Sequence, residues 1–342
     1  MQLKLALLAL LVLPALSQAA PVDKYFGYFG GDYDSVHAAN PGGPGFEEMK
    51  DHINLYQILV WSADVSATGK AVSETYVLSE LAKAKAAHVH AMVPAFPFVF
   101  RTTFDSSHHQ NSCWTIEPDA AAAWSSLAQK MVDRGYLIPG DPAHSTVVAT
   151  YIVDEPNASA ACLADVNGQA SPAWVNAVNA IRQGPGTANL PIASIMTDDF
   201  QNNMRQGIQL LDWVGFDHYG YTDSQWQNSM NALKSVAPGK KYIVVPGAMQ
   251  GCARVQVEGT SRFFSAIEND STVTWIAPFA WYSGKDGVAT CKGVRDLPDL
   301  RTTYTAEGIK IRDLQCASSP GEQWFCGKAV DITPAINYLL GD

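Results

Sequence analysis

Short apolar runs and segments of helical pattern alternate along most of the chain. The apolar runs are continuous and do not switch between apolar and polar residues, which is typical of parallel strands covered on both faces. We predict strands at eight such runs: Tyr25–Gly30, Leu55–Trp61, His90–Phe96, Val147–Val153, Ile192–Met196, Trp213–Phe216, Tyr242–Pro246 and Thr274–Ala280.

Helical segments lie between most of these runs. The predicted helices are Glu74–Ala87, Ala120–Gly135, Trp174–Arg182, Ser224–Val236 and Ser261–Glu268. Eight strands with intervening helices indicate an α/β fold, a single (β/α)8 TIM barrel. An open doubly wound sheet is the alternative, but no glycine-rich phosphate loop follows any strand. With no repeat or linker in the chain, we expect one barrel domain over residues 21–342.

The first twenty residues have the pattern of a secretion signal peptide. Lys4 supplies a positive charge, Leu5–Leu13 is apolar, and Ser17–Ala19 offers small residues for cleavage. The apolar run is shorter than the roughly 20 residues of a membrane-spanning helix. We therefore expect a secreted protein, extracellular or periplasmic, that begins after residues 1–20.

All six cysteines follow this segment, and an even number in an exported chain indicates three disulfides. The sequence alone leaves fifteen pairings open. Because loops at the ends of neighbouring strands lie close together, we predict the pairs Cys113–Cys162 and Cys252–Cys291. Cys316 and Cys326, near the end of the chain, form the third predicted pair.

The charge and composition of the chain narrow the range of binding partners that we expect. Only 16% of residues are charged, below the roughly 25% of ordinary soluble proteins, and the net charge is −10. This balance argues against nucleic acid or an anionic membrane, which reward clustered Lys and Arg. Nine Trp and thirteen Tyr suit a neutral ligand with stackable faces, such as a carbohydrate. We expect no cofactor, and a monomer.

Carboxylates mark the carboxyl ends of the strands, where barrel enzymes place their chemistry. Asp154 and Glu155 follow Tyr151–Val153 directly, at the tip of a buried strand. A carboxyl that is partly desolvated and crowded by another has a raised pKa, as a general acid at neutral pH requires. Glu155 is therefore our first candidate for a catalytic acid.

Three segments carry a resemblance to known proteins. Residues 151–157, Tyr-Ile-Val-Asp-Glu-Pro-Asn, resemble the Asp-Glu-Pro end of strand four in TIM-barrel glycoside hydrolases of the clan A type, where the Glu is acid/base. Residues 212–219 are similar to the sixth strand of that superfamily, and Trp281 is similar to the Trp that often floors its sugar subsite. The resemblance implies a secreted glycosidase that cleaves O-glycosidic bonds of an oligo- or polysaccharide by carboxylate acid/base chemistry.

Strand seven departs from that pattern. The clan carries a nucleophilic Glu there, whereas this run ends at Gln250, and the next Glu is Glu258. Asp217 is the first candidate for the second carboxylate, because strands four and six share a barrel layer. The reverse assignment, with Asp154 as nucleophile and Asp217 as acid, resembles the arrangement in other barrel glycosidases, of the α-galactosidase type. The sequence leaves both open.

Further strand-end residues are candidates for substrate binding by hydrogen bonds or by stacking on sugar rings: Asp32, Trp61, Tyr219, Gln250, Trp281 and Tyr282.

Two other functions remain open. Gln250 in place of a nucleophile favours a non-catalytic carbohydrate-binding barrel, but binding alone rarely needs buried charge. His88-Val89-His90 has the form of a metal-binding motif, as in metal-dependent barrel hydrolases. It opens strand three, on the face opposite the expected active site, so we expect no metal.

Overall fold

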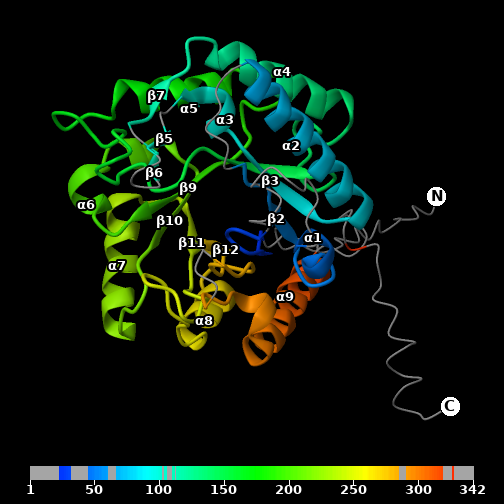
Figure 1. The fold of residues 1–342 in the computed structure, drawn as a ribbon, viewed down its shortest axis with the longest axis vertical. Coiled ribbons are helices and arrows are strands. Elements are labelled where there is room, and N and C mark those ends of the chain that lie inside the picture. The colour runs from blue at the N-terminus through cyan, green and yellow to red at the C-terminus, as the bar shows by residue number, and fades with distance from the viewer. Residues whose placement is uncertain are drawn as a thin grey trace, which may run out of the picture.

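The computed structural model describes residues 23–31, 45–60, 67–101, 104–105, 110–111, 113–284, 290–318 and 326. Eight strands, joined in parallel to their neighbours, curve into a barrel surrounded by helices (Figure 1). Each strand lies within or overlaps one of the predicted runs, so the (β/α)8 barrel is confirmed. The strands are β1 (Tyr25–Phe26), β2 (Leu55–Gln57), β3 (His90–Pro94), β8 (Val147–Tyr151), β9 (Ile192–Thr197), β10 (Trp213–Asp217), β11 (Lys241–Val244) and β12 (Val273–Ile276).

The gap in the sheet between its first two strands, β1 and β2, is closed by hydrogen bonds of Asn54. The Asn54 side chain accepts a hydrogen bond from the Phe26 amide at 2.6 Å and donates to the Lys24 carbonyl at 2.9 Å. The Asn54 amide in turn donates to the Phe26 carbonyl at 3.1 Å. A Cβ at Gly27 would stand 1.8 Å from the Leu55 carbonyl oxygen, so only glycine allows this approach.

All five predicted helices are present. The helix α2 (Ala67–Ala87) begins seven residues before its predicted start, and the other four differ from the prediction by at most two residues at either end: α4 (Ala120–Asp133), α5 (Pro172–Arg182), α7 (Asp223–Val236) and α8 (Ser261–Asn269). The sequence did not predict the short helices α1 (Gly45–Met49), α3 (Phe96–Val99) and α6 (Phe200–Asn203), the 3-10 turns η1 (Gly207–Leu210) and η3 (Val294–Asp296), or the small ladders of β4 (Phe100–Arg101) with β7 (Thr115–Ile116) and β5 (Phe104–Asp105) with β6 (Gln110–Asn111).

The largest missed element is α9 (Pro298–Ser318), which packs beside β1. Gly308 lies within it, and glycine ordinarily weakens a helix. Here its lack of a Cβ is needed, because a Cβ would stand 2.1 Å from the His52 carbonyl oxygen and 2.8 Å from the Phe26 ring. Tertiary packing therefore stabilises a helix that the local sequence disfavours.

The hydrophobic core has two shells. Inward side chains such as Leu55, Met92 and Tyr151 fill the barrel, and a second cluster lies between the strands and the surrounding helices. Tyr56 belongs to this outer cluster and follows Leu55 directly, which shows the alternation of a strand packed on both faces. None of the helices in the described part of the chain is both long enough and apolar enough to span a bilayer.

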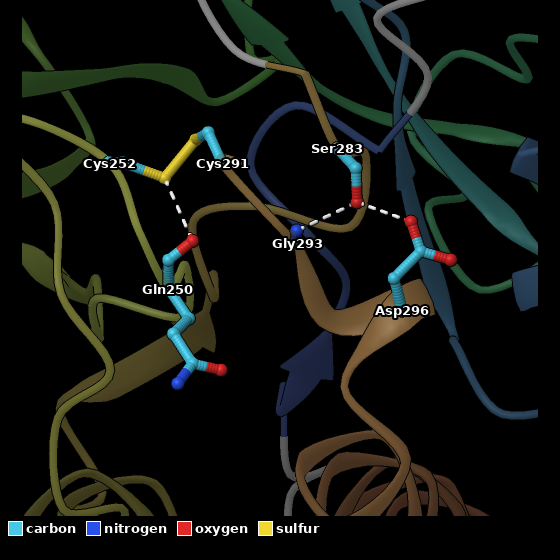
Figure 2. The surroundings of a disulfide bond; sticks show 6 residues. All are labelled: Gln250, Cys252, Ser283, Cys291, Gly293 and Asp296. Atoms are coloured by element: carbon cyan, nitrogen blue, oxygen red, sulfur yellow. Dashed lines mark hydrogen bonds between the residues drawn. A yellow bond between two sulfur atoms is a disulfide. The ribbon is translucent and has the colours of Figure 1, made fainter. Parts of the chain in front are cut away.

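Three disulfides are present, and all three predicted pairs are confirmed: Cys113–Cys162, Cys252–Cys291 and Cys316–Cys326. The first joins the segment between β3 and α4, which contains Cys113, to the loop after β8. The second joins the loops after β11 and β12. Figure 2 shows the second bond beside Ser283, which donates a hydrogen bond to Asp296 at 2.6 Å and accepts one from the Gly293 amide at 2.9 Å. Two disulfides therefore fasten loops at the carboxyl rim. The predicted signal peptide, residues 1–20, lies outside the described residues.

Candidate active site

Asp217 is the last residue of β10 and turns inward. The barrel alternation places Trp213 inside and Val214 outside, so Asp217 falls on the interior face at the carboxyl end. Its Oδ2 accepts a hydrogen bond from the Tyr219 hydroxyl at 3.2 Å. Its Oδ1 is shielded from solvent and has no hydrogen-bond partner within the described residues. The Tyr219 hydroxyl thus holds one carboxyl oxygen in place, and Glu155 interacts with the same buried carboxyl.

Asp154 and Glu155 lie at the end of β8, as predicted. Both are half-buried. The Tyr151 hydroxyl, inside the barrel, donates to Asp154 Oδ1 at 2.7 Å and accepts a hydrogen bond from the Ile195 amide at 3.3 Å. This arrangement fixes the Asp154 carboxylate through a side chain of the barrel core.

The backbone of Glu155 has an uncommon conformation. Its φ is +42°, a region that residues other than glycine seldom occupy. Its amide donates to the Ile195 carbonyl and its own carbonyl accepts from Ala158, both at 2.9 Å. Strained residues of this kind persist where surrounding contacts hold them, and they cluster at functional sites.

Asn157 supplies part of that support. Its side-chain oxygen accepts from the Thr197 amide at 2.8 Å, and its nitrogen donates to the Thr197 hydroxyl at 2.7 Å and to Asn203 at 3.1 Å. Because Thr197 ends β9, Asn157 ties the strand-end turn that carries Glu155 to the neighbouring strand.

The electrostatics of the site centre on Asp217. Burial raises the pKa of its carboxyl well above the usual value of 3.8, and the negative charges of Glu155 and then Asp154 raise it further. The hydrogen bond from Tyr219 opposes these effects only in part. Burial and the nearby carboxylates also raise the pKa values of the Tyr219 and Tyr151 hydroxyls, which therefore stay protonated as donors. The arrangement favours a protonated Asp217 facing other carboxylates.

The end of strand seven holds no candidate nucleophile. Glu258 does return to this place, but its carboxylate accepts hydrogen bonds from the Gly247 amide at 2.8 Å, the Gly220 amide at 3.1 Å and Arg262 at 2.6 Å. It is buried and ion-paired, so it acts as a structural tie. Gln250 is exposed at the rim, where its backbone exchanges two 2.8 Å hydrogen bonds with Lys292, and Figure 2 shows its side chain extending away from the disulfide.

Two predicted stacking residues are packed inside the protein. Trp281 has no exposed surface, its indole nitrogen donates to Glu48 at 2.9 Å, and its ring contacts Tyr28 and His52. Tyr282 is 2% exposed and meets the Phe279 ring edge-on. The structure thus corrects the expectation of an exposed platform: both rings stabilise the turn after β12.

The remaining predicted residues divide between the site and the part that is not described. Tyr219 lies in the site, with its ring stacked at 6.0 Å on Phe279. Asp32 and Trp61 lie outside the described residues. His90 is buried at the start of β3, where it contacts Tyr25 and hydrogen-bonds the Ser145 carbonyl at 2.8 Å. Within the described ranges, no group of three or more His, Cys, Asp or Glu side chains is arranged to hold a metal ion.

Sequence reasoning missed Tyr151 as a site residue. It was counted only as an apolar member of strand four. The alternation of faces along the strand was the available signal. It turns Tyr151 into the barrel, just before the predicted carboxylates Asp154 and Glu155.

A scan against protein-family models finds no match, and a search of curated proteins finds none either. Solved structures do match. A fungal β-1,4-galactanase aligns with a TM-score of 0.51 and 13% identity, over 84% of this chain and 99% of that one. A protein named XacCel5A gives 0.49 and 15% over 84% and 99%, and a Rhizomucor miehei β-1,3-glucanosyltransferase gives 0.45 and 12% over 80% and 92%. At 13% identity the likeness to the galactanase shows the fold, a (β/α)8 barrel.

Proposed function

We propose that the protein is a glycoside hydrolase that cleaves O-glycosidic bonds of an oligo- or polysaccharide with Asp217 and Glu155 as its catalytic pair. The observation that carries the proposal is the raised pKa of Asp217 between two other carboxylates at the carboxyl end of the barrel. Two titratable groups whose surroundings separate their protonation states are the usual acid/base arrangement of a glycosidase. The fold, which it shares with a β-1,4-galactanase, agrees with this function.

We infer a different position for the proton from the one that the sequence favoured. Glu155 was expected to be the acid, yet Asp217 is the carboxyl whose surroundings favour the protonated form. We propose that Asp217 donates its proton to the departing glycosidic oxygen. We assign the role of the anion to Glu155, whose charge raises the pKa of Asp217 more than that of Asp154 does. It attacks the anomeric carbon or takes a proton from the attacking water.

The neighbouring groups support these two roles. Tyr219 orients Asp217 through Oδ2, and in this proposal Oδ1 carries the proton that the substrate receives. Tyr151 holds Asp154, whose negative charge raises the pKa of Asp217 and stabilises the positive charge that develops on the sugar ring. The distance between the two catalytic carboxyls in a ligand complex decides stereochemistry, because about 5–5.5 Å implies retention and about 6.5–9.5 Å inversion.

The first experiment is a hydrolysis screen of the mature protein. β-1,4-Galactan is the first substrate because the galactanase has this fold, followed by cellulose, xylan and laminarin and by 4-nitrophenyl glycosides of both anomers. Released reducing ends or nitrophenol should appear with at least one substrate. Binding to these glycans without any turnover would favour the carbohydrate-binding barrel instead.

Leaving-group dependence then separates the roles. Asp217→Asn should lose about 10²–10⁴-fold on the natural glycan and far less on activated aryl glycosides, which need little protonation. Glu155→Gln should slow both substrates alike. The opposite result, with Glu155→Gln rescued by good leaving groups, would restore the assignment expected from the sequence.

Export of the protein is part of the proposal. The three disulfides agree with an oxidising compartment. We propose that residues 1–20 are removed on secretion and that residues 21–342 act as one monomeric domain. Amino-terminal sequencing of protein from culture medium, with light scattering for its mass, tests both statements.

A further inference from the structure

Gln57, the last residue of β2, is buried with its amide unsatisfied. The residue is 2% exposed, and neither Nε2 nor Oε1 has a hydrogen-bond partner within the described residues. Buried side-chain amides nearly always have partners, because an unsatisfied polar group costs free energy in the folded state. Such an amide is therefore available for hydrogen bonds with a bound ligand or water.

The side chain of Gln57 points into the barrel. Leu55, two residues earlier, belongs to the interior cluster, whereas Tyr56 and Ile58 belong to the cluster beneath the helices. A strand alternates its faces with a period of two, so Gln57 is on the interior face with Leu55. Its register partner Met92 also belongs to the interior cluster.

The barrel topology places Gln57 opposite Asp217. In the sheet order, three strands (β3, β8 and β9) separate β2 from β10 on one side, and three (β1, β12 and β11) on the other. β2, β8, β10 and β12 are alternate strands, which share the layers of side chains that fill a barrel of this kind. Gln57 and Asp217 both end their strands on the inward face, at the same carboxyl end.

We propose that Gln57 is a substrate-binding residue at the base of the active site. Its side-chain amide accepts hydrogen bonds from, and donates them to, the hydroxyl groups of a sugar ring that lies between Gln57 and Asp217. The proposal rests on the glycosidase function. A sugar hydroxyl both donates and accepts, so one hydroxyl or two neighbouring ones satisfy the acceptor Oε1 and the donor Nε2 together. A sugar in this place would also satisfy the amide, for which the described residues provide no hydrogen-bond partner.

The test compares Gln57→Met with the control Met92→Leu. Both substitutions keep the side chain similar in size, and both lie on the interior face of the barrel. Gln57→Met should lower kcat/KM about 10-fold on whichever glycan the wild type cleaves, because the hydroxyl contacts are lost. Met92→Leu should leave it within about 2-fold. Without ligand, Gln57→Met should melt no lower than the wild type, because an unsatisfied amide is removed.

A second readout does not depend on hydrolysis. Glucose, galactose, mannose and xylose, at about 50 mM each, should include at least one sugar that raises the melting temperature of the wild type and of Met92→Leu but not of Gln57→Met. This result would keep the Gln57 site even if the hydrolysis screen fails. The proposal is overturned if Gln57→Met keeps full kcat/KM, if no sugar separates it from the wild type, or if it melts markedly lower, as loss of a structural water would cause.

Discussion

At the scale of one residue, the buried carboxyl of Asp217, which the proposed chemistry needs, lowers the stability of the fold. In the unfolded chain its carboxyl titrates near the usual value of 3.8, whereas burial and the neighbouring carboxylates raise its pKa in the folded protein. Below pH 3.8 both states are protonated and the group has no effect. As the pH rises, the unfolded chain releases the proton first, so the free energy of unfolding falls until the folded pKa is passed.

Asp217→Asn should therefore stabilise the protein while it impairs catalysis. The melting temperature of the variant should exceed that of the wild type by a few degrees at neutral pH and match it below about pH 4. Asp51→Asn, at an exposed carboxyl, is the control and should show no such divergence. Melting curves between pH 3 and 8 measure this, and equal pH profiles for Asp217→Asn and the wild type would contradict the raised pKa.

At the scale of elements, the contact between α8 and α9 holds a second unfavourable carboxyl. Glu307 is 5% exposed, and Oε1 has no hydrogen-bond partner within the described part of the chain. Burial and the charge of Glu268 on α8 raise the pKa of Glu307 to about 7 from 4.5, and Lys310 opposes this shift. Because Lys310 is already paired with Glu268, the compensation is incomplete.

Replacing this carboxyl should change the pH dependence of stability. The wild type loses stability as the pH rises from 4.5 through 7, since the folded protein retains the proton longer than the unfolded chain. Glu307→Gln should remove this loss and gain on the order of 2 kcal/mol at pH 8, with no gain at pH 4. Chemical denaturation at the two pH values measures the difference. Glu47→Gln, on the exposed face of α1, serves as the control, and a gain that does not depend on pH would refute the explanation.

At the scale of the whole molecule, two disulfides fasten the loops around the barrel mouth and the third closes the end of α9. The rim bonds close segments of 49 and 39 residues, each worth about 4 kcal/mol by loop entropy. The third bond closes only 10 residues, worth about 3 kcal/mol. All three bonds should therefore contribute to stability, whereas only the rim bonds should also affect activity.

Paired Cys→Ser substitutions separate the two effects. Removal of Cys113–Cys162 should lower both the melting temperature and kcat/KM, because Cys162 belongs to the loop that follows Glu155. Removal of Cys316–Cys326 should lower the melting temperature alone. Kinetics at 25 °C, with the folded fraction checked by circular dichroism, distinguish these outcomes; unchanged kcat/KM after loss of the rim bond would show that it does not position the site.

The sequence by itself determined the order of the main elements, the barrel and the acidic strand ends, and the barrel topology then predicted the pairing of the cysteines. These depend on local signals, because short continuous apolar runs are typical of buried parallel strands, and a barrel of such strands brings neighbouring strand ends together. The exceptions were α9 and the closure at Asn54, whose stability comes from contacts with segments distant in the chain.

Only the tertiary structure decided what each side chain experiences. The sequence favoured Glu155 as the acid and Trp281 as a stacking platform. In the fold, burial and nearby charges raise the pKa of Asp217, Trp281 is buried against Glu48, and the Gln57 amide has no hydrogen-bond partner among the described residues. The reason is that a pKa, an exposed face or an unpaired amide depends on neighbours from other strands. Glu155 and Asp217 are far apart in the chain, and their charges interact only once the barrel has formed.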